Sequence, residues 1–140
     1  MDLFKFRSKK KKLKGWTLTE ILIVLAIIGI LVMLVLPNQT AVIGKAKAKE
    51  AQLQLDMVYK LQLSNFYERS KYSDDLKSIG FIQEKLVSQG GQANYKIELI
   101  EASNNHFKAT ATSVTDFDGD GSFNVWQIDH EKNLIEVIPD

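Results

Sequence analysis

The sequence predicts an α+β fold, in which a long N-terminal helix packs against a C-terminal antiparallel sheet of about four strands. Three observations predict it. Residues 21–36 form an unbroken apolar run, helical periodicity resumes after that run, and residues 95–138 alternate between apolar and polar side chains. A chain of 140 residues is long enough for one such domain beside a membrane element.

The first 15 residues are a basic leader that carries seven lysine or arginine side chains against one aspartate. Because the whole chain has a formal net charge of only +1, the part after the leader is acidic. Lysine and arginine next to an apolar segment resist translocation, so we expect the leader in the cytoplasm and the residues after Pro37 outside. The acidic part shows no basic stripe interleaved with aromatic residues, which argues against a nucleic-acid partner.

Residues 16–37 are the expected transmembrane helix, because about 20 apolar residues cross the roughly 30 Å of hydrocarbon in a bilayer. A secretory signal peptide has a shorter apolar core and a small-residue cleavage site, whereas this run ends in Leu-Pro-Asn. A signal peptide and a plain uncleaved anchor are the alternative interpretations. The plain anchor leaves Glu20 unexplained, since a carboxylate inside a membrane is costly and usually has a partner.

The junction between the leader and the apolar run reads KGWTLTE. Gly15 closes the leader, the aromatic Trp16 follows, and Glu20 is the fifth residue after the junction. This motif resembles the class III signal peptide of type IV pilins and type II secretion pseudopilins. The resemblance implies that a prepilin peptidase cuts between Gly15 and Trp16 and that the new amino group of Trp16 is methylated, although phenylalanine is usual there. It also implies that Glu20 pairs with that amine on an adjacent subunit during assembly.

The same resemblance implies a structural subunit that waits in the inner membrane with its C-terminal domain outside. Inner-membrane assembly machinery would pack it with other copies and related pilins into a filament, at the cell surface or in the periplasm. In filaments of the family the helix can lose its regular form between the glycine and the proline, here Gly29 and Pro37. A surface pilus and a secretion pseudopilus share all of these features, so both interpretations stay open.

Residues 38–72 are predicted to continue the helix as an amphipathic segment, perturbed where Pro37 removes a backbone donor. Apolar residues recur there at steps of three and four, while Lys45, Lys47 and Lys49 fall between them and are expected on a solvated face. The apolar positions are Ala41, Val42, Ile43, Ala46, Ala48, Ala51, Leu55, Val58 and Leu61.

Residues 73–140 are expected to form a loop and the antiparallel sheet. The stretch from Glu68 to Phe81 indicates a helix end, a turn and a short second helical piece closed by Gly80. After it, period-two alternation predicts four strands with one apolar face laid on the helix. The strands are predicted near residues 95–99, 107–111, 126–128 and 134–138.

An acidic loop between the second and third predicted strands reads TDFDGDGSFN. Carboxylates at alternate positions followed by a glycine are typical of the start of an EF-hand calcium loop, because they converge on one cation. The expected calcium ligands are Asp116, Asp118, Asp120, Ser122 and Asn124.

The twelfth position of this loop holds Gln127, where a complete EF-hand places a bidentate glutamate, and Asp129 is a weak candidate for the missing oxygen. The alternative is an aspartate- and glycine-rich turn that needs no metal. Because the chain has no cysteine, calcium would take the stabilising place of the disulfide that many pilins carry. The alternative function is then a membrane-anchored or secreted calcium-binding domain that does not polymerise.

Catalysis is not predicted, because no nucleophile, phosphate-binding or metalloprotease motif occurs in the chain. The two histidines, His106 and His130, are expected in or beside turns. Glu98 and Glu101 are three residues apart, which places them on opposite faces of a regular strand, so they are not expected to form an acid and base pair.

Overall fold

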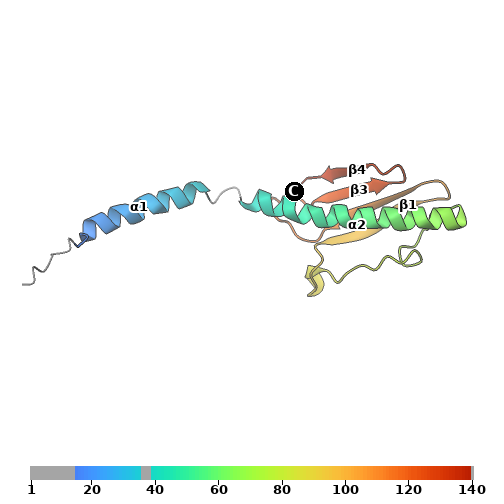
Figure 1. Ribbon diagram of the computed structural model, residues 1–140, viewed down its shortest axis with the longest axis horizontal. Helices are drawn as coiled ribbons and strands as arrows, with labels where there is room; N and C mark the ends of the chain where they lie inside the picture. Colours follow the sequence, from blue (N-terminus) through green and yellow to red (C-terminus); the bar gives the residue numbers. More distant parts are fainter. Residues whose placement is uncertain (1–14, 36–38, 140) are drawn as a thin grey trace, which may run out of the picture. The chain divides into compact units, whose positions relative to one another are not determined.

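The computed structural model describes residues 15–35 and 39–139, which belong to two compact units, residues 1–37 and 38–140. The predictions for Pro37 and for the leader before Gly15 lie outside the described residues. Figure 1 shows the elements in chain order, with one α-helix in the first unit and an α-helix and a four-stranded sheet in the second. The second unit also contains the short 3-10 helix η2, Val87–Gln89. The predicted α+β class and the number of strands are confirmed.

Helix α1 spans Leu18–Val35 and is the one helix in the described part of the chain that is long and apolar enough to cross a membrane. None of its residues is buried. It runs through Gly29 without a break, and the loss of regular helix expected after Gly29 concerns the assembled filament and stays a prediction. A single glycine lowers the stability of a helix by only about 1 kcal/mol relative to alanine, which is too little to interrupt a helix of 18 residues.

Helix α2 spans Gln39–Arg69, and its buried residues lie along one side of the helix. It ends three residues before the predicted boundary, because Ser70 adopts a left-handed conformation with φ of 56° and closes the last turn onto Phe66. The buried stripe of the helix recurs at steps of four and three. Its members are Gly44, Ala48, Ala51, Leu55, Val58, Gln62 and Asn65.

The segment after α2 corrects one prediction, because residues 76–80 form a turn and not a second helix. The N–H of Phe81 donates to the carbonyl of Leu76, and the N–H of Gly80 donates to Lys77. This pair of bonds, with Gly80 at φ of 86°, is the pattern that normally closes a helix, here after a single turn. A buried amide anchors the loop, since Gln62 bonds both the N–H and the carbonyl of Ser73 at 2.8 Å.

The sheet is a simple antiparallel meander with strand order β1-β2-β3-β4. Its strands are β1 Tyr95–Ala102, β2 Phe107–Ser113, β3 Val125–Asp129 and β4 Leu134–Ile138. Helix α2 lies along one face of it, as Figure 1 shows. The core is formed where that face meets the stripe of α2, and small residues such as Ala109 and Ala111 let the helix approach closely. Tyr95, Phe107 and Ile128 are the large side chains that the sheet buries there.

A β-bulge in β1 corrects the prediction for its two glutamates. Glu98 lies opposite Thr110 and Glu101 lies opposite Lys108, with a register shift between them. Since Thr110 and Lys108 are two residues apart on β2, both glutamates lie on the same, solvent-facing side of the sheet. Glu98 pairs with Lys96 at 2.7 Å and Glu101 with Lys108 at 3.5 Å, so both carboxylates are charged surface groups.

Candidate functional site

The predicted cleavage junction is exposed in the structure. Trp16 is 73% exposed, and Gly15 lies outside any helix or strand. A side chain added at Gly15 would meet nothing within 4 Å. The fold itself therefore places no steric demand on glycine here, and any demand for it must come from a molecule that binds the junction.

Glu20 lies in the first turn of α1 and closes the N-terminal end of that helix. Its Oε2 atom accepts hydrogen bonds from the backbone N–H of Thr17 at 2.7 Å and from the Thr17 hydroxyl at 2.8 Å. In return the Glu20 N–H donates to the Thr17 hydroxyl at 3.3 Å. This reciprocal arrangement is a capping box, and the sequence signal for it is the T-x-x-E spacing of Thr17 and Glu20. The role of Thr17 in this capping box was not predicted from the sequence.

The capping box uses only one of the two carboxylate oxygens. The Oε1 atom of Glu20 accepts no hydrogen bond, and the carboxylate forms no ion pair, within the described residues. The side chain is exposed, as are Trp16 and Thr17 beside it. The N-terminal end of α1 therefore presents an anionic oxygen with room for a cationic partner.

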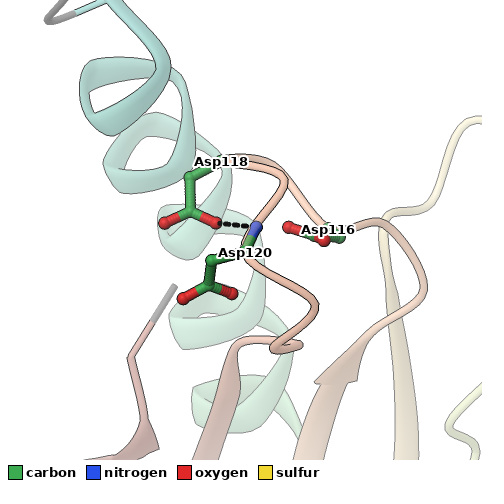
Figure 2. Close-up of side chains that lie close together, drawn as sticks. All are labelled: Asp116, Asp118 and Asp120. Atoms are coloured by element: carbon green, nitrogen blue, oxygen red, sulfur yellow. Dashed lines mark hydrogen bonds between the residues drawn. The ribbon is translucent and has the colours of Figure 1, made fainter.

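The acidic loop joins β2 to β3, and Figure 2 shows its three aspartates converging. One oxygen of each carboxylate lies within 4.8 Å of one oxygen of the other two. Two ligand oxygens on opposite sides of one calcium ion are about 4.6–5.2 Å apart, because calcium–oxygen distances are 2.3–2.6 Å. Asp116, Asp118 and Asp120 are thus close enough together to share one ion.

Backbone N–H groups of the loop hold these carboxylates in place. Asp116 accepts from Gly119 at 2.7 Å and from Gly121 at 2.8 Å, and these two bonds hold the pKa of its carboxyl below the usual range. Both glycines have positive φ, 81° and 90°, which is the conformation that glycine adopts without strain. Asp118 and Asp120 accept in turn from the N–H two residues further on. Backbone hydrogen bonds within the loop therefore hold its shape, which is also what an aspartate- and glycine-rich turn without a metal ion would show.

The structure does not bring Asn124 to this cluster. Its side chain is 1% exposed; its Oδ1 accepts from the Tyr95 hydroxyl at 2.8 Å, while its Nδ2 donates to Glu136 at 2.7 Å. Its backbone carbonyl accepts from Ser113 at 2.8 Å. Because all these groups are already bonded in the core, the prediction that Asn124 is a calcium ligand is wrong. Asn124 has the spacing of an EF-hand ligand, but the spacing does not show that this residue directly precedes strand β3 and packs into the core.

Three other positions bear on the predicted ion site: Ser122 and Asp129 as candidate ligands, and Gln127 as the residue in place of the usual glutamate. Ser122 is half-buried beside the cluster, and its N–H donates to Asp120 at 2.6 Å. Gln127 lies in β3, opposite Thr110 and Ile135. Asp129 closes the turn between β3 and β4, where it accepts from Glu131 and Asn133, so it serves that turn and not the acidic loop.

No protein-family model matches the chain. The chain is 38% identical over 84 residues to the type IV major pilin protein PilA of Myxococcus xanthus (strain DK1622). The match covers 60% of this chain and 36% of that relative. Since that relative is a structural pilin, the similarity supports the type IV pilin family, which the N-terminal motif predicts.

Proposed function

We propose that this chain is a structural pilin: it is inserted in the inner membrane through α1, cleaved between Gly15 and Trp16, and packed with other copies into a filament. Its similarity to a type IV major pilin supports this proposal. The observation that carries it is the exposure of α1, whose 18 residues are apolar around the whole helix except near its N-terminal end and include none that is buried. Such a helix needs lipid or neighbouring helices around it.

Glu20 gives the assembly step a chemical basis. A charged side chain in hydrocarbon costs about 2.5–3.5 kcal/mol at a helix centre on insertion scales, and less near the helix ends. The capping box offsets part of this cost with hydrogen bonds to Oε2, while Oε1 stays available. The α-amine that cleavage creates on Trp16 of a neighbouring copy would supply the counter-ion, and this pairing would set the register between copies.

The decisive variant is Glu20→Gln, which keeps the shape of the side chain and removes its charge. We expect it to be cleaved at Gly15 like the wild type, as mass spectrometry of the mature N-terminus would show, but to yield few or no filaments in electron micrographs. Glu68→Gln, which removes an exposed charge on α2, is the matched control and should assemble normally. Filaments of Glu20→Gln at wild-type yield would contradict the proposal.

Gly15→Leu tests the cleavage step separately. Because nothing lies within 4 Å of an added side chain, the fold accepts this change, and a loss of processing would report on the peptidase alone. We expect the full-length precursor to accumulate in the membrane fraction. A mature chain beginning at Trp16 in this variant would contradict cleavage by a glycine-requiring peptidase.

We also propose that the acidic loop binds calcium through Asp116, Asp118 and Asp120, with the carbonyl of Ser122 in reach of the same ion. The convergence of the three carboxylates within 4.8 Å supports this proposal. Calcium should then raise the melting temperature of the second unit, and chelation should reverse the rise. Asp118→Ala should abolish this response, whereas Asp74→Ala, at an exposed aspartate outside the loop, should keep it. Identical melting of the wild type with calcium and with chelator would contradict calcium binding.

The two functional alternatives give different outcomes. A type II secretion pseudopilin would form short periplasmic filaments and leave surface pili unaffected. A calcium-binding domain that does not polymerise would respond to calcium as above but would keep its basic leader or be cut at another site. Mass spectrometry of the N-terminus together with imaging of labelled filaments separates all three.

A further inference from the structure

The two histidines of the chain lie side by side although they are far apart in the sequence. His106 directly precedes β2 and His130 directly follows β3, and these strands are antiparallel neighbours. The two turns therefore meet at one end of the sheet. The ring centroids are 6.2 Å apart, with an angle of 59° between the planes. The proposed pilin function uses neither residue.

Ser103 holds the ring of His106 through Nδ1. The hydroxyl oxygen of Ser103 lies 2.7 Å from Nδ1, and it also accepts the backbone N–H groups of Asn105 at 3.3 Å and of His106 at 3.2 Å. Because this contact occupies Nδ1, Nε2 is the nitrogen that an ion would bind. With an ion on Nε2, Nδ1 would carry the hydrogen and face the Ser103 oxygen, and a histidine that ligates a metal normally has its other nitrogen held in this way.

His130 is also restrained by its surroundings. Its ring is half-buried and lies 6.4 Å from the ring of Tyr72, at 63° between planes. Asp129, the residue before it, has both carboxylate oxygens bonded to the turn, and this ionised group adds negative charge beside the two rings. Restrained rings lose less side-chain entropy when they bind a common ligand.

We propose that His106 and His130 together bind a divalent transition-metal ion that prefers imidazole, such as Cu²⁺ or Zn²⁺. Metal–nitrogen bonds of about 2.0–2.1 Å put each ring centre roughly 3.2 Å from a shared ion, so the centres are about 6.4 Å apart when the two nitrogens lie on opposite sides of the ion and about 5.2 Å apart in a tetrahedral site. The observed 6.2 Å is close to the first arrangement, which square-planar Cu²⁺ allows, and a tetrahedral ion would draw the exposed ring of His106 about 1 Å closer. The remaining coordination positions face solvent, because His106 is exposed, so water or a ligand from another molecule completes the site.

Cu²⁺ added alone to the full-length chain in detergent tests this site, with calcium present in excess to occupy the acidic loop. We expect one equivalent of Cu²⁺ to show nitrogen hyperfine splitting from two imidazoles in its electron paramagnetic resonance spectrum. His106→Asn and His130→Asn should each weaken binding at least tenfold in a competition titration with a chelator of known affinity. Asn105→Ala, in the same turn, should bind like the wild type. Ser103→Ala keeps both ligands but frees the ring of His106, so it should weaken binding by a smaller factor.

Two results would overturn the proposal. One is a Cu²⁺ affinity that is unchanged in either histidine variant, which would assign the bound ion to the amino terminus or to carboxylates. The other is a spectrum with only one imidazole nitrogen in the wild type. If a variant does not fold, Zn²⁺ titration of the wild type decides the question, because both histidine ring signals in the NMR spectrum must shift together up to one equivalent. Because the readout is metal binding, the result does not depend on whether the chain forms filaments.

Discussion

Helices α1 and α2 are both long, but they differ in the burial of their apolar side chains among the described residues of their own units. In α2 a stripe of small and apolar residues packs on the sheet, and Ala51, Leu55 and Val58 are fully buried. In α1 the side chains are apolar around nearly the whole helix, and none is buried within the described residues. The second unit therefore has a hydrophobic core of its own, whereas the apolar side chains of α1 are not covered within the described part of their unit.

The largest expected effect is on stability, and it compares the same substitution, leucine to alanine, in the two helices. Leu55→Ala removes a side chain that is 0% exposed, so it should lower the free energy of unfolding of the second unit by about 2–5 kcal/mol. Leu25→Ala in α1, where the side chain is 58% exposed, should leave that unfolding unchanged. Thermal unfolding of the full-length chain in detergent, followed by the signal of the sheet, measures both. Equal shifts in the two variants would break the comparison.

The polar end of the α2 stripe provides the second test, because Gln62 and Asn65 are buried there among apolar residues. Gln62→Leu leaves the N–H and the carbonyl of Ser73 without their partner and should cost about 1–3 kcal/mol. Gln54→Leu is the matched control, since the Oε1 atom of Gln54 is buried with no hydrogen-bond partner among the described residues. It should be neutral or stabilising, as measured by urea unfolding. A larger loss from Gln54→Leu than from Gln62→Leu would contradict the role given to the loop anchor.

Much of this comparison could be predicted from the sequence. A continuous apolar run identified α1, steps of three and four identified α2, and period-two alternation identified all four strands. These patterns are visible because helices and strands bury residues at regular steps along the chain. The end of α2 was misplaced because it depends on the left-handed backbone of Ser70, a residue that rarely adopts that conformation.

The details of the sites depend on contacts that no local pattern contains. Asn124 fits the spacing of a calcium ligand, but its partner Tyr95 lies 29 residues earlier in the chain. The bulge that puts Glu98 and Glu101 on one side of the sheet follows from the register with β2. His106 and His130 meet only because two turns lie at the same end of the meander. In contrast, the capping box of Thr17 and Glu20 is local, and its spacing was visible in the sequence.

Asp129 gives the smallest expected effect and tests whether the second unit also stabilises its own turns. Burial alone would raise the pKa of this carboxyl, but hydrogen bonds from Asn133 and from the N–H of Glu131 outweigh it, so the pKa is lowered. A carboxyl with a lowered folded-state pKa adds stability above its unfolded value of about 3.9, and that stability is lost as the pH falls through the folded-state pKa. Because solvent screens the site, the contribution should stay below about 1 kcal/mol.

The Asp129→Asn variant should therefore be slightly less stable than the wild type at pH 7, and the difference should shrink as the pH falls below the unfolded-state value of about 3.9 toward the lowered folded-state pKa. Melting curves of both proteins between pH 3 and pH 7 measure this. Asp74→Asn, at an exposed aspartate that accepts no hydrogen bond among the described residues, controls for the loss of one charge. A stability difference between the wild type and Asp129→Asn that grows toward low pH would contradict this prediction. It would mean that the turn stabilises the protonated carboxyl and not the ionised one.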